Sequence, residues 1–313
     1  DHVGESLLPA SIPVLEELGV LQQIEKENFP KKLGATMVWG NDDKPWSWYF
    51  SETNRTYPHS YQVSRPRFDQ ILLENSRSFG VDVREAANVF EVLTDEDSGA
   101  VHGVRYRSDE GVVNALEADF VIDASGQSAL LARAMKLRKW DTFFQNLAVY
   151  AYYKGARRLP EPNESNIFIE SYRQGWMWTI PLKDGLSSVG AVVDSEASQS
   201  RLTKLGPDDF LKQQISQTAR TGNMLSDAEM VDGPHVIRDW SYTTNRMVGD
   251  GWMLVGDAAC FVDPLFSSGV HLALMSAVMA AGYVHSVHED PTMRVPAGAV
   301  YEQMYRKEYT HFR

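Results

Sequence analysis

The chain has 313 residues and an ordinary globular composition, with 43% hydrophobic and 23% charged residues. Its formal net charge of −12 argues against nucleic-acid binding as its main role. A single cysteine, Cys260, excludes an intrachain disulfide framework and any multi-cysteine zinc site. No apolar run approaches the roughly 18–20 residues of a membrane span, and the N-terminus shows no signal peptide. We therefore expect a cytoplasmic protein without a membrane or nucleic-acid partner.

Hydrophobic periodicity predicts helices and strands along the whole chain. In chain order, the expected elements are a helix over 7–18, strands over 35–39 and 46–50, a helix over 65–79, a strand over 81–84, a hairpin over 101–106 and 112–116, a buried strand over 119–123, strands over 146–153, 166–170, 176–180 and 187–193, a helix over 207–219, a strand over 252–255, and helices over 268–285 and 301–309. An α/β pattern thus brackets a β-rich insert.

This pattern predicts an α/β fold in which a Rossmann-like domain is interleaved with a β-sheet-rich domain. The expected boundaries are 1–30, 55–140 and 245–290 for the first domain, 31–54 and 141–244 for the second, and 291–313 for the start of a C-terminal helical region. We also expect both ends to be truncated. The first residues resemble the middle of a βα unit, and the last helix stops without a capping signal.

Three short segments follow or precede predicted elements in a way that suits nucleotide binding. They are Gly4-Glu5-Ser6 before a helix, residues 123–128 after a buried strand, and Gly256-Asp257-Ala258-Ala259 between a strand and a helix. Glycine lets the backbone approach a ligand closely, aspartate accepts a hydroxyl, and helix N–H groups stabilise negative charge. Each segment alone is most simply a turn. The three in this order favour a binding site.

Together with residues 62–69 at the head of the second predicted helix, these segments resemble the FAD-dependent monooxygenase superfamily of the para-hydroxybenzoate hydroxylase fold, over nearly the whole chain. The resemblance implies FAD in the first domain. It implies as cofactor-binding residues Gly4, Glu5, Ser6, Arg65, Asp123, Gly126, Gly256, Asp257, Pro264 and Gly269. The family's Gly-x-Gly-x-x-Gly fingerprint is not found, and we expect it upstream of His2.

The segment Trp176-Met177-Trp178-Thr179-Ile180-Pro181 narrows the resemblance. Alternation alone predicts an aromatic strand with Trp176 and Trp178 on one face. The whole segment resembles the Trp-x-Trp-x-Ile-Pro motif of flavin-dependent halogenases, in which these tryptophans keep the substrate from direct attack by the flavin hydroperoxide. The resemblance implies that chloride or bromide is oxidised by a flavin C4a-hydroperoxide, and that a separate flavin reductase supplies FADH2. An electron-rich aromatic compound is then halogenated.

Two further site elements are implied by the same resemblance. Lys32 matches the lysine that holds the oxidised halogen, with Lys31 as the alternative; a solvated lysine in a charged run is the simpler interpretation. Burial would lower its pKa toward reactivity. Ser268 and Gly269 match the loop whose backbone amides bind the halide, while an N-cap by Ser267 is the simpler interpretation.

The substrate is expected to be a phenol or a pyrrole, either free or tethered to an acyl or peptidyl carrier protein. Phe266 stands where the tryptophan-specific branch of the family has an acidic residue, which points away from free tryptophan. A basic cluster could dock an acidic carrier, although a solvated helix face is the simpler interpretation; it consists of Arg133, Lys136, Arg138 and Lys139.

Three alternatives stay open on the sequence. The chain could be an aromatic hydroxylase of the same fold, a flavoprotein reductase of isoprenoid chains, or a catalytically incomplete flavoprotein fragment. The histidines show no metal-ligand spacing, and no serine lies in a Gly-x-Ser-x-Gly elbow. We therefore expect no metal site and assign these residues no catalytic role.

Overall fold

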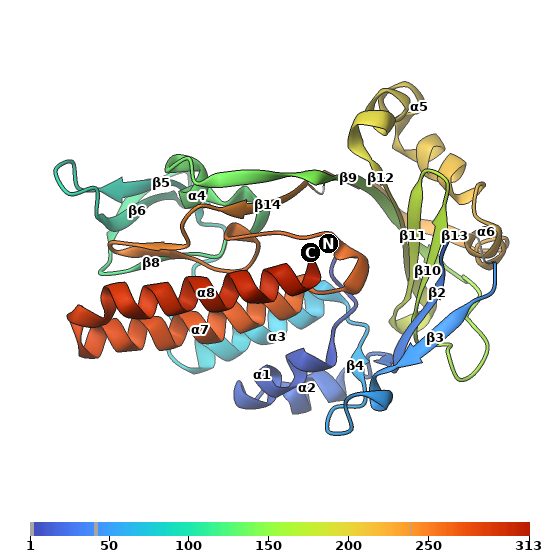
Figure 1. Cartoon of the computed structure of the whole chain (residues 1–313), viewed down its shortest axis with the longest axis horizontal. Coiled ribbons are helices and arrows are strands. Elements are labelled where there is room, and N and C mark those ends of the chain that lie inside the picture. The colour runs from blue at the N-terminus through green and yellow to red at the C-terminus, as the bar shows by residue number, and fades with distance from the viewer. Residues whose placement is uncertain (1–2, 41–42, 239) are drawn as a thin grey trace. The chain divides into compact units, whose positions relative to one another are not determined.

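The computed structural model describes residues 3–40, 43–238 and 240–313. The chain divides into two compact units, coloured along the chain in Figure 1. Unit 1 comprises Asp1–Asn75 and Phe143–Trp240, and unit 2 comprises Ser76–Thr142 and Ser241–Arg313. The expected mixed α/β class is confirmed. The functional-domain boundaries stay a prediction, since compactness groups residues 1–30 with the β-rich segment.

A large sheet forms the body of unit 1, in the order β13-β9-β12-β11-β10-β2-β3. Neighbouring strands are antiparallel except β10 and β2, which are parallel. The strands are β2 (Gly34–Val38), β3 (Trp46–Tyr49), β9 (Arg138–Lys154), β10 (Ile167–Tyr172), β11 (Gly175–Pro181), β12 (Leu186–Asp194) and β13 (Glu229–Ile237). The central strands are apolar on both faces because both faces are covered.

Helix α5 (Ser195–Ile215) packs against β12 and β13 of this sheet. The other helices of this part of the chain are η1 (Pro9–Ser11), α1 (Ile12–Glu17), α2 (Leu21–Lys26), η2 (Phe50–Glu52), α3 (Arg65–Ser78), η4 (Lys183–Gly185) and α6 (Ala219–Met224). The core beneath α5 contains Met177, Val189 and Phe210. The helix expected over 207–219 begins earlier, because Asp194 caps α5 by accepting from the Ala197 N–H. A kink at Gly206 separates the two halves of α5.

Unit 2 combines short sheets with two long antiparallel helices. Its elements are β5 (Asn88–Thr94), β6 (Val101–Arg107), β7 (Val113–Glu117), β8 (Val121–Asp123), η3 (Gly126–Ser128), α4 (Leu130–Ala134), β14 (Trp240–Thr244), β15 (Val248–Gly249), β16 (Trp252–Leu254), η5 (Gly256–Ala258), η6 (Pro264–Phe266), α7 (Gly269–Glu289), η7 (Pro291–Met293) and α8 (Arg294–Phe312). The sheets are β15-β16-β8 and β5-β6-β7. Helices α7 and α8 pack side by side (Figure 1).

One local prediction in unit 2 was wrong, and another was confirmed. Residues 81–84 form no strand, although they alternate in polarity. The expected hairpin is the β6–β7 part of a three-stranded sheet, whose third strand, β5, is largely exposed and shows too little alternation to be found in the sequence.

Helix α7 also corrects the expectation that no segment is long and apolar enough to cross a membrane. By length and composition alone, α7 passes that test. Length and composition do not separate a membrane-spanning helix from a core helix, and 33% of the tested window of α7 is buried. Helix α7 packs against α8 and contributes Leu272, Ala280 and Tyr283 to the core of unit 2.

Candidate functional site

Lys32 is a buried lysine in unit 1. It belongs to β1 (Lys31–Lys32), which pairs with β4 (Ser60–Tyr61). Its neighbour Lys31 points to solvent, whereas Lys32 is only 2% exposed. Burial lowers the pKa of the Lys32 amine from an ordinary 10.5 to about 7. The interpretation as a solvated lysine is therefore wrong for Lys32, and the functional role of Lys32 stays a prediction.

Trp176 and Trp178 lie on one face of the large sheet, as expected. The cross-strand register pairs Trp178 with Ile169 of β10 and with Gly190 of β12, and it pairs Gly190 with Tyr150 of β9. Residues paired in this way share a face. The ring centroids of Trp176 and Trp178 are 6.0 Å apart, and those of Trp178 and Tyr150 are 6.1 Å apart. The sheet thus presents a buried aromatic surface.

The segment Gly4-Glu5-Ser6 reaches this surface through the Glu5 carboxyl group. The Tyr152 hydroxyl donates to Glu5 Oε1 at 3.0 Å, and the Gly4 N–H donates to Glu5 Oε2 at 3.0 Å. Burial raises the pKa of Glu5, and hydrogen bonds from Ser188 and Tyr152 oppose that rise. Glu5, expected to bind FAD, is therefore engaged by side chains of its own unit.

Ser6 and Arg65 differ in whether their polar side-chain atoms form hydrogen bonds within unit 1. Ser6 forms an isolated bridge with Gln62, and its buried hydroxyl has no hydrogen-bond partner among the described residues. Arg65, at the start of α3, pairs with Asp69 at 3.0 Å and donates to the Val3 carbonyl at 3.0 Å. Ser6 consequently has unused capacity for a ligand, while Arg65 also holds the N-terminal segment.

The Gly256-Asp257 turn in unit 2 is fixed by hydrogen bonds to its backbone. The Tyr305 hydroxyl of α8 donates to the Gly256 carbonyl at 2.9 Å, and the Tyr242 hydroxyl donates to the Asp257 carbonyl at 2.6 Å. The Gly256 N–H donates to the Ser276 hydroxyl at 2.9 Å. Because these groups are buried, the turn has one defined conformation.

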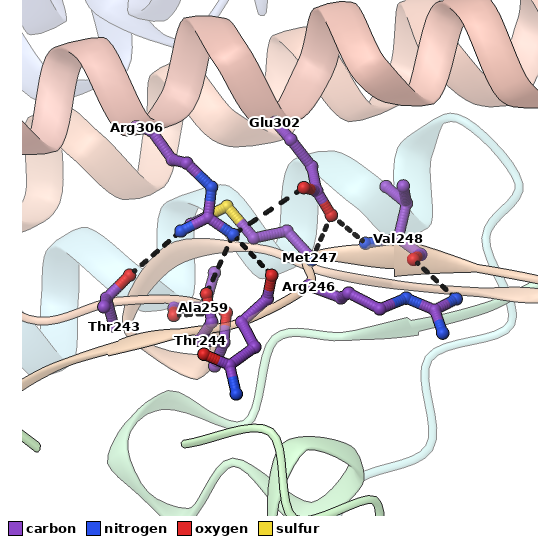
Figure 2. A network of polar contacts seen from close by, with 9 residues as sticks. Thr243, Thr244, Arg246, Met247, Val248, Ala259, Glu302 and Arg306 are labelled. Atoms are coloured by element: carbon purple, nitrogen blue, oxygen red, sulfur yellow. Dashed lines mark hydrogen bonds and ion pairs between the residues drawn. The ribbon is translucent and has the colours of Figure 1, made fainter. Parts of the chain in front are cut away.

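Figure 2 shows a second set of contacts that holds this region to α8. The Glu302 carboxylate accepts from the backbone N–H groups of residues 247–248. The Arg306 guanidinium donates to the Thr244 carbonyl at 2.8 Å. The Thr244 hydroxyl in turn donates to the Ala259 carbonyl at 3.0 Å. Helix α8 therefore supports the Gly256-Asp257 turn both directly and through this segment.

Asp123 and Gly126 shape the turn after β8. Asp123 accepts from the Ser125 N–H at 2.9 Å and from the Leu131 N–H at 2.8 Å, so both carboxylate oxygens hold the turn together. Gly126 has a φ of 62°, which glycine adopts without strain. The role of Asp123 in the structure is that of a turn-stabilising residue, and cofactor contact at these positions stays a prediction.

The predicted halide loop leads directly into α7. Asp263 caps η6, because its carboxylate accepts a hydrogen bond from the Leu265 N–H. Ser267 has a φ of 58°, so the expected N-cap moves by one residue to the buried Ser268, and α7 begins at Gly269. A left-handed residue before a helix start turns successive backbone N–H groups toward one side. This is a geometry that suits an anion.

Each unit, taken by itself, has positions that fit part of a flavin nucleotide. A side chain at Gly256 would meet the Ala273 Cβ at 3.3 Å, and its φ of 56° strains other residues, so glycine keeps the backbone open there. The unsatisfied Ser6 hydroxyl and the free N–H groups that an α-helix leaves in its first turn supply polar contacts. Within the described ranges, no group of three or more His, Cys, Asp or Glu residues could hold a metal ion.

The basic cluster does not form a helix face. Arg133 lies in α4, Lys136 follows it with a φ of 54°, and Arg138 and Lys139 begin β9. The Arg138 guanidinium lies 4.1 Å from the centre of the Tyr242 ring. Arg138 is therefore a packed residue, and the interpretation of the cluster as a solvated helix face was wrong.

A pocket of about 550 Å³ lies elsewhere in unit 1, between α5, α6 and the sheet. Tyr153, Leu211, Lys212 and Met230 are among its lining residues, and none of the predicted site residues lines it. Tyr153 belongs to the core on the α5 side, with Met177, so this pocket opens on the face opposite the tryptophans.

Comparison with known proteins identifies the family. A sequence profile described as tryptophan halogenase matches residues 52–313. The chain belongs to this family. The chain is also similar to a solved structure, the myxobacterial chondrochloren halogenase CndH, described as a variant of FAD-dependent halogenases. The TM-score is 0.93 at 38% identity, over 99% of this chain and 72% of the other.

Two curated relatives illustrate the range of the family. The tryptophan 2-halogenase of Chondromyces crocatus is 32% identical over 311 residues, which cover 98% of this chain and 58% of the relative. The 1H-pyrrole-2-carbonyl-[peptidyl-carrier protein] chlorinase of Pseudomonas fluorescens is 31% identical over 333 residues, which cover 98% of this chain and 72% of the relative. The chain thus spans little more than half of the first of these proteins.

The comparisons confirm that the chain belongs to the expected family of flavin-dependent halogenases, and they do not favour membership among the hydroxylases. The individual site residues stay predictions. The structure places Lys32, the two tryptophans and the Gly4-Glu5-Ser6 segment in unit 1, and the Asp123, Gly256 and Ser268 segments in unit 2.

Several supporting residues were missed in the sequence. Ser188 and Gly190 lie in the segment after the tryptophan motif, and a β11–β12 hairpin register would have placed them beside Trp178. Tyr305 and Glu302 gave no such signal, because their partners lie about 50 residues away in sequence.

Proposed function

We propose that this chain forms the catalytic core of a flavin-dependent halogenase that acts on an electron-rich aromatic compound. The observation that carries the proposal is the buried Lys32, whose amine has a pKa of about 7 and lies in the same unit as the Trp176 and Trp178 surface. An ordinary structural lysine has no reason to be buried at this cost.

Lys32 would hold the oxidised halogen. Bound FAD supplies the activation of oxygen, and Gly256, Asp257 and Ser6 are the residues proposed to hold it. Near neutral pH the Lys32 side chain exchanges between amine and ammonium, so it can accept a hydrogen bond from hypohalous acid or donate one to it. Its burial keeps water away from that species.

The tryptophan surface would decide between halogenation and hydroxylation. Trp176 and Trp178 are 8% and 5% exposed, so their rings fill space on the sheet face. We propose that this bulk keeps the substrate from direct oxygen transfer and leaves the small hypohalous acid as the only species that reaches it. The halide would bind at the N–H groups of Ser268 and Gly269, where α7 begins.

The substrate is proposed to be a phenol or a pyrrole. One relative is named for tryptophan and another for a pyrrole on a peptidyl carrier protein. Phe266, half exposed in the halide loop, argues for the second kind, because it brings no charge to pair with a free amino acid. A separate flavin reductase as the source of FADH2, and a carrier protein as the substrate's tether, complete the proposal.

The test is an incubation with reduced FAD, oxygen and either bromide or chloride, with a phenol, a carrier-bound pyrrole or free tryptophan as acceptor. Mass spectrometry of the products separates the alternatives. We expect a halogenated phenol or pyrrole. A hydroxylated product without halogen would establish the hydroxylase instead, and halogenated tryptophan alone would overturn the substrate assignment.

A further inference from the structure

The indole ring of Trp178 is held in one orientation by the neighbouring strand β12. Its Nε1–H donates to the Ser188 hydroxyl at 3.1 Å. Its six-membered ring covers Gly190, where an added Cβ would lie 2.3 to 2.7 Å from three ring atoms. The indole therefore lies flat over Gly190 and ends at Ser188, and no side chain larger than hydrogen fits beneath it.

The Ser188 hydroxyl connects this ring to a buried carboxyl group. A serine hydroxyl has one hydrogen to donate, and Trp178 occupies Ser188 as an acceptor. Ser188 pairs across the sheet with Tyr152, whose hydroxyl donates to Glu5 at 3.0 Å, so Ser188 lies beside that carboxyl group. Ser188 also opposes the rise in the pKa of Glu5, as a hydroxyl that donates its hydrogen to the carboxyl group would. The result is a directed chain of hydrogen bonds that runs from Trp178 to Ser188 and from Ser188 to Glu5.

Glu5 is well suited to end this chain. It is 2% exposed, and it also accepts from the Tyr152 hydroxyl and the Gly4 N–H, each at 3.0 Å. A group surrounded by donors must act as an acceptor, and a carboxylate is the side chain that only accepts. Removing any member leaves a buried polar group unsatisfied, so the chain is held as a unit.

We propose that Ser188 and Glu5 are positioning residues that fix the ring plane of Trp178. They act through Trp178 and need not touch the substrate. The consequence for chemistry rests on the proposed function: a fixed indole keeps the shape of the aromatic surface in the unit that contains Lys32, the surface proposed to separate halogenation from direct oxygen transfer, whereas a mobile indole would let the oxidised halogen be lost to water. Glu5 therefore gains a role different from the cofactor contact expected for it.

The strand itself offers a matched control. Ser187 precedes Ser188 in β12, is 1% exposed, and points to the opposite face. Its hydroxyl has no hydrogen-bond partner among the described residues. Ser187→Ala and Ser188→Ala thus remove the same atom from equally buried positions, and only the second removes an acceptor from Trp178.

The experiment measures hydrogen–deuterium exchange of indole N–H protons in the chain labelled with ¹⁵N-tryptophan. The Trp178 signal is the one lost in Trp178→Phe. We expect Ser188→Ala to speed its exchange by about tenfold, the factor for about 1.4 kcal/mol. We expect Glu5→Gln, which places an amide donor among donors, to speed it as well. Ser187→Ala leaves it unchanged.

Equal Trp178 exchange in Ser188→Ala and Ser187→Ala would overturn the proposal, as would a Glu5→Gln variant that exchanges like the unsubstituted chain. A parallel assay measures brominated phenol formed per oxygen consumed, and we expect Ser188→Ala to lower that ratio while Ser187→Ala keeps it. If the exchange rates change as expected but the unsubstituted protein brominates nothing, the proposed function fails and the positioning role stands.

Discussion

The side-chain nitrogen of Lys32 lies 5.5 Å from the centre of the Phe50 ring, within unit 1. Burial lowers the pKa of this amine from an ordinary 10.5 to about 7. Between these two values the unfolded chain binds the proton that the folded chain has released. Stability rises with pH wherever the unfolded state binds more protons. The cost of burying Lys32 is therefore complete below pH 7 and disappears toward pH 10.5.

Lys32→Met removes that cost. We expect it to raise the free energy of unfolding by a few kcal/mol near neutral pH, and by progressively less as the pH approaches about 10. The matched variant is Lys31→Met, at the exposed neighbour, which should change stability by less than about 0.5 kcal/mol at either pH. Urea unfolding at the two pH values measures both. A gain for Lys32→Met that does not depend on pH would contradict the lowered pKa.

Gly190→Ala should disturb the tryptophan surface. The new Cβ would meet the Trp178 ring at 2.3 Å, so the indole must move, and we expect a loss of about 1–3 kcal/mol in unfolding free energy. Gly282→Ala is the contrasting substitution. Gly282 lies inside α7 with nothing within 4 Å of its added Cβ, so alanine should stabilise by up to about 1 kcal/mol. Thermal unfolding should therefore show a lower midpoint for Gly190→Ala and a higher midpoint for Gly282→Ala, although both substitutions add one methyl group.

Comparing Tyr305→Phe with Tyr301→Phe distinguishes a hydrogen bond that holds the Gly256 turn from one that holds the strand before it. The Tyr305 hydroxyl binds the Gly256 carbonyl at 2.9 Å, and the Tyr301 hydroxyl binds the Leu254 carbonyl at 2.6 Å. Each variant should lose about 1 kcal/mol of stability. Only Tyr305→Phe should also weaken FAD binding, by about fivefold, which corresponds to about 1 kcal/mol. Equal FAD titration curves for the two variants would show that the Gly256 carbonyl orientation does not matter for binding.

Glu302→Ala tests the contacts drawn in Figure 2. The substitution leaves the backbone N–H groups of residues 247–248 without their charged acceptor, so we expect a loss of about 2–3 kcal/mol. Glu289→Ala, at an exposed position near the end of α7, should change stability by less than about 0.5 kcal/mol. Similar denaturation midpoints for both variants would be the contrary result.

The tryptophan strand and the face that its two tryptophans share could be predicted from the sequence. Trp176 and Trp178 alternate with Met177, and an alternating motif specifies which side chains share a face before any contact is known. The choice of Lys32 rather than Lys31 as the predicted halogen-holding residue rested on the family resemblance alone. In a strand these neighbours point to opposite sides, but which side is buried depends on the strand β4 that pairs with them.

Long-range contacts account for what the sequence did not reveal. Glu5 and Ser188 are far apart along the chain, and nothing local marks either as a hydrogen-bonding residue. The start of α5 was placed too late because Pro207 looked like a first helical residue, which it is only for the half after the kink at Gly206. The truncation of both ends and the cytoplasmic location stay predictions.

Under the proposed function, this chain halogenates through Lys32. The most direct measurement compares the unsubstituted protein with Lys32→Met in reduced FAD, oxygen, bromide and a phenol, and records brominated phenol and oxygen consumption together. We predict brominated phenol from the unsubstituted protein, and from Lys32→Met continued oxygen consumption with at least a hundredfold less brominated product, the factor for about 2.7 kcal/mol. Brominated phenol formed at an unchanged rate by Lys32→Met, or hydroxylated phenol as the main product of the unsubstituted protein, would contradict it.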